Sequence, residues 1–139
     1  MNSLSFFAVM EPPTTTHQMQ KVRVLHGKPQ LYEPADVADA RAKLKAHLAG
    51  HRPDAPFDGP LELYTAWHFP LCGDHQDGEF RISKPDTDNL QKLLKDVLTG
   101  LGYWVDDARV AREITEKYWA KVPGIYIRLR SLGEDLSHE

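Results

Sequence analysis

Residues 84–110 read KPDTDNLQKLLKDVLTGLGYWVDDARV, and this stretch decides the fold. Asp88 is of a type favoured at helix N-termini, and leucines and valines follow it at helical spacing until glycines appear. The pattern predicts a helix over residues 88–99 with Asp88 as its N-cap. A short glycine-containing connection then leads to Tyr103–Val105, which predicts a short buried strand running back beside the helix.

Outside this stretch, hydrophobic periodicity predicts an α+β domain. A helix is expected over residues 35–49, and a hairpin from strands at 21–25 and 30–32. Further strands are indicated where apolar residues alternate or run together, at residues 4–10, 61–69, 109–119 and 124–130. The last two are expected to form an antiparallel pair. The prediction is a small mixed β-sheet with flanking helices in one domain of residues 1–132, followed by an acidic, frayed tail at 133–139.

Composition narrows the class of protein. The 139 residues carry 17 Lys and Arg against 20 Asp and Glu, a net charge of −3, which argues against a protein that coats nucleic acid by bulk charge. A mean hydropathy of −0.50 and the lack of a long apolar run predict a soluble chain without a membrane partner. The single cysteine, Cys72, excludes an internal disulfide framework and favours a reducing, cytoplasmic compartment.

Carboxylates gather at both ends of the 84–110 stretch. Asp86 and Asp88 stand at the start of the predicted helix, and the returning strand is expected to bring Asp106 and Asp107 back to their level. Clustered carboxylates suit Mg²⁺ or Mn²⁺, which bind phosphate oxygens and promote phosphodiester hydrolysis. Asp96 lies ~12 Å along the helix from Asp88, too far to share one ion with it. Taken alone, each aspartate pair can equally be a turn or capping feature.

One lysine of the predicted helix faces the same way as its first aspartate. Lys92 follows Asp88 by four residues and therefore lies on the same helix face, one turn further in. An ammonium group there can contact the scissile phosphate or the departing oxygen.

The motif KPDTDNLQK, followed by Asp96, Gly100 and YWVDDARV, resembles the signature of the RusA family of Holliday-junction resolvases. The resemblance implies a bacterial or prophage-encoded endonuclease acting in DNA recombination and repair. It implies a Mg²⁺-dependent homodimer that binds four-way DNA junctions and nicks two strands symmetrically.

Carried over by position, the resemblance assigns roles to individual residues. It makes Asp86, Asp88 and Asp107 the catalytic metal-binding carboxylates and Lys92 the functional lysine of the helix. Asp106 matches the companion acid of the motif, and Asn89 and Asp96 are assigned supporting roles. The sequence departs from the family pattern at Arg109, where glutamine is usual, so the role of that position is left open.

Basic residues outside the aspartate pairs are candidates for phosphate contacts. Residues 1–32 carry a local net charge of +2, from Lys21, Arg23 and Lys28 against Glu11. They can position DNA without reading sequence, or be ordinary solvated charges of a hairpin. The further candidates for DNA binding are Lys84, Lys95 and Arg109.

Three alternatives stay open. The chain can be a metal-dependent nuclease for flaps, forks or other branched DNA. It can also be a non-catalytic DNA-binding protein that uses the same scaffold. His68, Cys72 and His75 are sparsely spaced like zinc ligands, but a structural zinc site needs four ligands, so an incidental polar loop is the favoured interpretation.

Overall fold

The four longest strands form one mixed sheet in the order β1-β6-β4-β5. The computed structural model describes residues 3–16 and 21–133, and the strand bounds are β1 (Ser3–Val9), β4 (Leu61–Pro70), β5 (Val110–Ala120) and β6 (Gly124–Ser131). Strand β6 is antiparallel to both β1 and β4, whereas β4 and β5 are parallel. The predicted α+β class with a mixed sheet is therefore confirmed.

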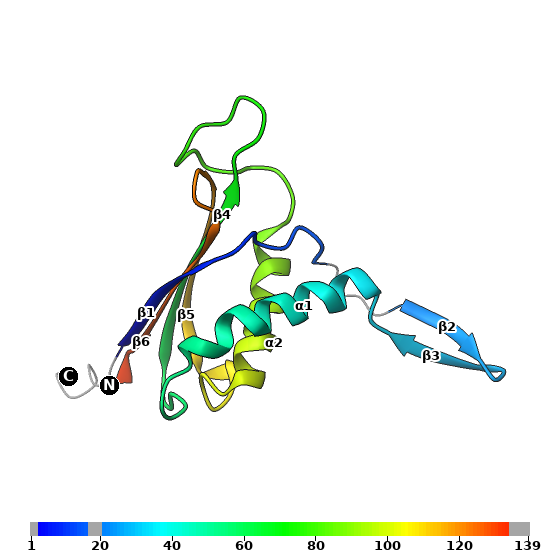
Figure 1. The fold of residues 1–139 in the computed structure, drawn as a ribbon. Coiled ribbons are helices and arrows are strands. Elements are labelled where there is room, and N and C mark those ends of the chain that lie inside the picture. The colour runs from blue at the N-terminus through cyan, green and yellow to red at the C-terminus, as the bar shows by residue number, and fades with distance from the viewer. Residues whose placement is uncertain (1–2, 17–20, 134–139) are drawn as a thin grey trace.

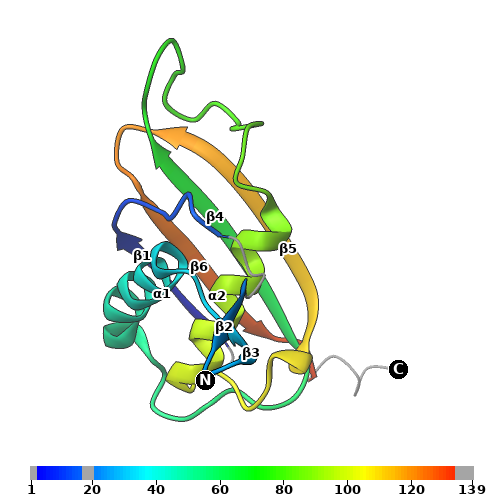
Figure 2. The ribbon, with the colours of Figure 1, turned by 90° about the vertical axis from the view of Figure 1, so that its right-hand side faces the viewer.

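Both α-helices described in the structure cover the same face of this sheet (Figures 1 and 2). Helix α1 (Ala35–Leu48) continues into a short 3-10 turn, η1 (Ala49–His51), and α2 (Thr87–Leu101) connects β4 to β5. Strand β4 turns alternate side chains toward the helices, and these are fully buried: Leu61, Leu63, Thr65, Trp67 and Phe69. They meet the leucine stripe of α2, so the core lies between helices and sheet.

The predicted antiparallel pairing of the last two strands is wrong, because β4 lies between β5 and β6. Strand β4 is almost wholly buried on both faces, which suits an interior position with partners on both sides. The first half of β5 is charged and exposed, as is typical of an edge strand. Helix α2 then carries the chain across, so that β5 joins β4 in parallel.

The predicted strand at Tyr103–Val105 is also wrong. Trp104 forms an isolated parallel bridge with Phe57, through hydrogen bonds from Phe57 N–H to Tyr103 O and from Val105 N–H to Phe57 O, both 2.9 Å. The segment is tied to the loop before β4 and does not run back along α2. It then enters the 3-10 turn η2 (Asp107–Arg109).

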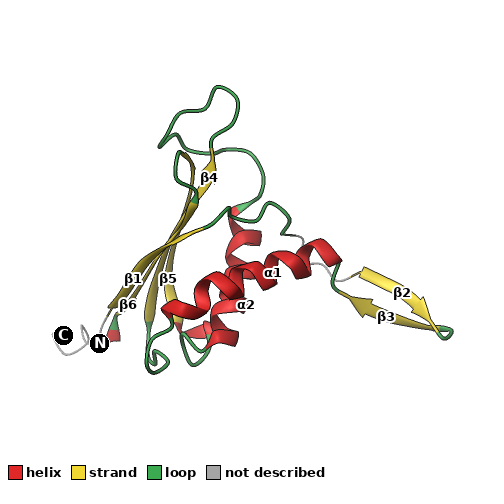
Figure 3. Ribbon diagram, viewed as in Figure 1, coloured by secondary structure: helices red, strands yellow, loops and turns green. Residues whose placement is uncertain are grey.

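The predicted hairpin is confirmed as β2 (Lys21–Leu25) paired with β3 (Lys28–Tyr32). His26 and Gly27 form its turn, and both have positive φ angles, as two-residue hairpin turns require. Figures 1 and 3 show the hairpin projecting from the N-terminal end of α1, away from the sheet. All but the first residue of the predicted acidic tail, 133–139, lies outside the described residues.

Gly124 opens β6 at a point where a side chain has no room. A Cβ built there would clash with the Phe7 ring and lie 2.6 Å from the backbone oxygen of Ala8. Gly124→Ala should therefore lower the free energy of unfolding by about 1–3 kcal/mol, measured by urea denaturation. Gly100→Ala is the control, because a Cβ on that helical glycine meets nothing within 4 Å. Equal stability of the Gly124 variant and the native chain would contradict this account.

Candidate active site

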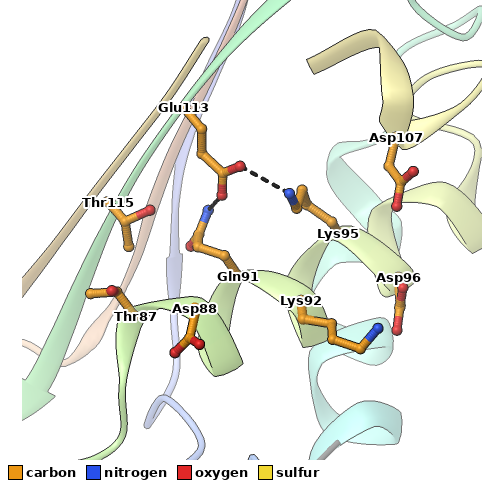
Figure 4. Close-up of a pocket in the computed structure, with 9 residues that line it drawn as sticks. All are labelled: Thr87, Asp88, Gln91, Lys92, Lys95, Asp96, Asp107, Glu113 and Thr115. Carbon is orange, nitrogen blue, oxygen red and sulfur yellow. Dashed lines mark hydrogen bonds and ion pairs between the residues drawn. The ribbon is translucent and has the colours of Figure 1, made fainter. Parts of the chain in front are cut away.

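A pocket of about 670 Å³ opens between α2 and β5, on the face of the sheet that carries the helices. All nine of its lining residues have polar or charged side chains (Figure 4). They are Thr87, Asp88, Gln91, Lys92, Lys95, Asp96, Asp107, Glu113 and Thr115. Four of the candidates from the aspartate-rich motif and its helix, namely Asp88, Lys92, Asp96 and Asp107, therefore share one pocket with Lys95.

The N-terminus of α2 supplies the first carboxylates. The structure places Asp86, not Asp88, at the N-cap, and the Asp86 side chain makes no capping hydrogen bond. Asp88 lies within the first turn, where its Oδ1 accepts a hydrogen bond from Asn89 N–H at 2.9 Å. Both carboxylates are exposed, and the helix dipole there favours negative charge. Asp86 directly precedes Thr87, which lines the pocket, but Asp86 does not line the pocket itself.

Asp107 reaches the pocket from the other end of α2. Strand β5 runs alongside α2 in the opposite direction. Lys117, late in β5, contacts Pro85 just before the helix, whereas Glu113, early in β5, contacts Gln91 and Lys95 further along it. The turn that precedes β5 consequently lies beside the C-terminal half of the helix. The expected return of Asp106 and Asp107 to the level of the first pair depended on a strand that does not form.

The carboxylates are distributed along the pocket and do not form one tight cluster. Figure 4 shows Asp88 at one side of the view and Asp107 and Asp96 at the other. No three His, Cys, Asp or Glu side chains within residues 3–16 and 21–133 lie close enough together to hold an ion. The Asp106 side chain binds the backbone of the following turn, because its Oδ1 accepts a hydrogen bond from Ala108 N–H at 3.0 Å.

The basic candidates differ in what they contact. Lys92 is exposed in the pocket and has no acidic partner among the described residues, so its ammonium group is available to a phosphate. Lys95 pairs with Glu113 at 2.9 Å. Arg109 pairs with Asp58, which occupies its guanidinium group at the position where the family motif has glutamine.

Of the remaining candidates, Asp96 also lines the pocket, whereas Lys28 and Lys84 do not. Asp96 faces Arg41 of α1 at 3.8 Å. The side chains of Lys84 and Lys28 are exposed, the latter at the hairpin turn. Lys21 and Arg23 lie on β2, but their side chains are outside the described part of the structure.

A buried polar chain supports the pocket and was missed in the sequence. Trp67 Nε1–H donates to Gln91 Oε1 at 2.9 Å, and Gln91 Nε2–H donates to Glu113 Oε2 at 2.8 Å. Gln91 is only 4% exposed, and Glu113 in turn holds Lys95. Gln91 stands between leucines of the buried helix stripe, which was the available signal for its burial. Its bond to Glu113 depends on the register of β5 beside α2, which no local pattern fixes.

Two further cations, both missed in the sequence, hold the segment that leads into α2. Lys117 Nζ donates to the carbonyl oxygens of Ser83 and Pro85, both at 2.7 Å. Arg81 Nη2 donates to the carbonyl oxygen of Lys84. Burial lowers the pKa of Lys117, Arg81 acts in the same direction, and the negative charge of Asp86 opposes both.

The three residues considered as zinc ligands do not converge. His68 lies between the rings of Phe7 and Tyr118, with centroid distances of 5.5 and 5.4 Å, and burial lowers its pKa. His75 pairs with Glu79 at 2.7 Å and stacks on Trp119, while Cys72 is exposed. Cys72 and His75 lie in the exposed loop after β4, whereas His68 lies on β4 itself.

Comparison with known proteins decides the family. The family model described as endodeoxyribonuclease RusA matches residues 11–130. The chain belongs to the RusA family. It is also 31% identical over 98 residues to the crossover junction endodeoxyribonuclease rusA of Lactococcus phage r1t. That match covers 69% of this chain and 73% of the relative. The RusA chain described here is accordingly an enzyme of the endodeoxyribonuclease class.

Within residues 3–16 and 21–133, neither α1 nor α2 has the length and apolar character that a bilayer crossing demands.

Proposed function

We propose that this RusA chain resolves four-way DNA junctions by cutting two strands symmetrically, in a reaction that depends on Mg²⁺ or Mn²⁺. One observation carries the proposal. The carboxylates of Asp88 and Asp107 share an open pocket with the ammonium group of Lys92, which pairs with no acid among the described residues, in a chain of an endonuclease family. The phage relative named as a crossover junction endodeoxyribonuclease supports the choice of substrate.

The donor atoms of the pocket fit a hard divalent cation. Asp88 and Asp107 offer exposed carboxylate oxygens that no described Lys or Arg neutralises, and Asp86 adds a third at the helix N-cap. Magnesium and manganese prefer oxygen ligands and keep several waters. A bound ion would supply an activated water and neutralise charge on the phosphate. We assign Asp86, Asp88 and Asp107 to hold it, for which the three carboxylates would have to lie closer together than they do in this structure.

Lys92 supplies positive charge from the protein. Its ammonium group can bind a non-bridging oxygen of the scissile phosphate or stabilise the departing oxygen as the phosphodiester breaks. In-line hydrolysis with a departing 3′ oxygen gives a 5′-phosphate and a 3′-hydroxyl. We assign supporting roles to Asn89, whose backbone N–H donates to Asp88, to Asp96 on the same helix, and to Asp106, which fixes the turn that carries Asp107.

Contacts to the DNA backbone are assigned to the basic residues around the pocket and on the β2–β3 hairpin. The hairpin projects from the body of the protein, and Lys28 is exposed at its turn, so it can reach a phosphate beyond the pocket (Figure 1). Further backbone contacts are assigned to Lys21 and Arg23 of β2 and to Lys84, which precedes α2. Lys95 and Arg109 contribute less than the sequence alone suggests, because Glu113 and Asp58 already pair with them.

Symmetric cutting of a junction requires two active sites related by a two-fold axis, and we therefore propose a homodimer. Sedimentation equilibrium should give twice the 15.8 kDa mass of the chain. A monomer that still cuts both strands of a junction would contradict the dimer.

A cleavage assay on a four-way junction in Mg²⁺, with products mapped on all four strands, tests the proposal. Paired cuts at symmetric positions are expected, together with much weaker cleavage of a flap and of a linear duplex. Preferential cutting of the flap would instead support a nuclease for other branched DNA. Tight junction binding without cleavage in Mg²⁺ or Mn²⁺ would support a non-catalytic DNA-binding protein.

A further inference from the structure

The segment between Arg81 and Asp86 approaches the pocket without regular secondary structure. The side chains of Ile82, Ser83 and Lys84 are exposed, so they do not anchor the segment by burial. Holding one residue in a single backbone conformation costs about 1–2 kcal/mol of entropy, and other contacts must supply that free energy. The position of Asp86 depends on this segment, because Asp86 follows it directly as the N-cap of α2.

Two cationic side chains, Lys117 of β5 and Arg81 directly before the segment, bind three consecutive carbonyl groups of this segment. Lys117 Nζ donates to Ser83 O and Pro85 O at 2.7 Å each, and Arg81 Nη2 donates to Lys84 O. Within the described residues, these are the hydrogen bonds that reach residues 82–85 from side chains of other residues. Charged donors form stronger bonds to carbonyls than neutral donors do.

The two cations are themselves held in place. The Arg81 guanidinium lies over two aromatic rings of neighbouring strands, 4.3 Å from the Phe69 centroid and 4.5 Å from the Trp119 centroid. The backbone N–H of Arg81 also donates to the carbonyl oxygen of Lys117 at 2.9 Å. Lys117 lies on β5 opposite Trp67 of β4, on the sheet face that carries the helices. The three hydrogen bonds from Lys117 and Arg81 to residues 83–85, called the clamp below, are therefore anchored in the sheet.

We propose that Lys117 is a positioning residue for the metal-binding carboxylates of the site, acting with Arg81 through the backbone of residues 83–85. This inference rests on the proposed function, since it assumes that Asp86 helps to hold the ion. Lys117 lines no part of the pocket, so it has no direct contact with the reacting phosphate. It fixes the direction from which the chain reaches Asp86 and the first turn of α2.

The test compares Lys117→Met with Lys117→Arg and with a surface control. Methionine keeps the length of the side chain but removes its donor, whereas arginine retains donors for the two carbonyls. Lys121→Met is the control, because the Lys121 side chain is exposed in the connection to β6 and contacts neither the clamp nor the pocket. Binding of Mn²⁺ to the DNA-free protein is measured by calorimetry, and amide hydrogen exchange is followed over residues 82–90.

Lys117→Met is expected to weaken Mn²⁺ binding roughly 10- to 100-fold, the usual effect of removing a residue that orients metal ligands. It should also accelerate amide exchange in residues 82–90 only, and lower kcat for junction cleavage with little change in KM. Lys117→Arg should restore most of the affinity, and Lys121→Met should match the native chain.

Unchanged Mn²⁺ affinity in Lys117→Met would overturn the positioning role, even if the native chain cuts junctions. Faster exchange throughout the protein, without rescue by arginine, would overturn it too, because Lys117 would then be merely structural. If the native chain binds Mn²⁺ but cuts no junction, the proposed function fails. A weaker affinity in Lys117→Met alone would still support the clamp in that case.

Discussion

Asp88→Asn is expected to lower the rate of four-way junction cleavage by at least about 10³-fold, while junction binding stays within about two-fold of the native chain. The amide has the shape of the carboxylate but carries no charge, so it is a poor ligand for Mg²⁺. Asp88 is exposed in the first turn of α2, so we expect the variant to stay folded and the loss of activity to come from the site. Single-turnover cleavage in Mg²⁺ and gel-shift binding without metal measure the two quantities.

The loss of activity can be separated from an effect on stability. Removing a negative charge from a helix N-terminus costs about 0.3–1 kcal/mol, which is too little to unfold the chain at 25 °C. Asp74→Asn is a suitable control, because Asp74 is an exposed aspartate of the loop after β4 and lines no part of the pocket. Cleavage by Asp88→Asn above a tenth of the native rate would remove Asp88 from the metal site.

Local sequence patterns predicted the elements of this fold better than their arrangement. The leucine stripe of α2 and the alternation in β4 are set by residues within a few turns or pleats, so both elements were located to within a few residues. Strand order depends on competition between distant segments. The apolar, doubly buried β4 takes the interior position, and this separates β5 from β6 although only a short turn joins them in the chain.

The candidate site shows the same division between what local patterns predict and what depends on distant segments. The motif residues Asp88 and Lys92 lie where helical periodicity places them, on one side of the pocket. The location of Asp107 was missed because residues 103–106 bind the Phe57 loop and do not form a returning strand. Contacts made by Glu113 and Lys117 depend on how β5 is aligned with α2, and alignment of two distant elements leaves no local signal.

The face of the sheet that carries no helix has a buried charge near the start of β4. Glu62 of β4 is 3% exposed in its side chain, and three arginines from the two neighbouring strands surround it. The nitrogen–oxygen distances are 3.0 Å to Arg112, 3.4 Å to Arg128 and 3.0 Å to Arg130. The hydrogen bond from Arg112 holds the pKa of Glu62 below its ordinary value of 4.5, although burial acts in the opposite direction.

Glu62→Gln should therefore lower the free energy of unfolding at pH 7 by about 3 kcal/mol, the lower end of the range for breaking a buried ion pair. The lower end applies because the three arginines are partly exposed and water screens their mutual repulsion. Urea denaturation measures the change. Glu33→Gln removes the acid from the half-exposed pair with Arg41, and its effect should stay below about 1 kcal/mol.

The pH dependence of the unfolding free energies of the native chain and Glu62→Gln tests whether the charge of Glu62 causes the difference in stability. Because the pKa of Glu62 is lower in the folded state, its ionised carboxylate stabilises the fold above its unfolded pKa, near 4.5. That stabilisation is lost as the pH falls through the lowered folded value, when the carboxylate takes up a proton. The difference in unfolding free energy between the native chain and Glu62→Gln should accordingly be constant from pH 7 to 5 and shrink below about pH 4.5. A difference that persists unchanged in acid would show that the negative charge of Glu62 is not what stabilises the sheet.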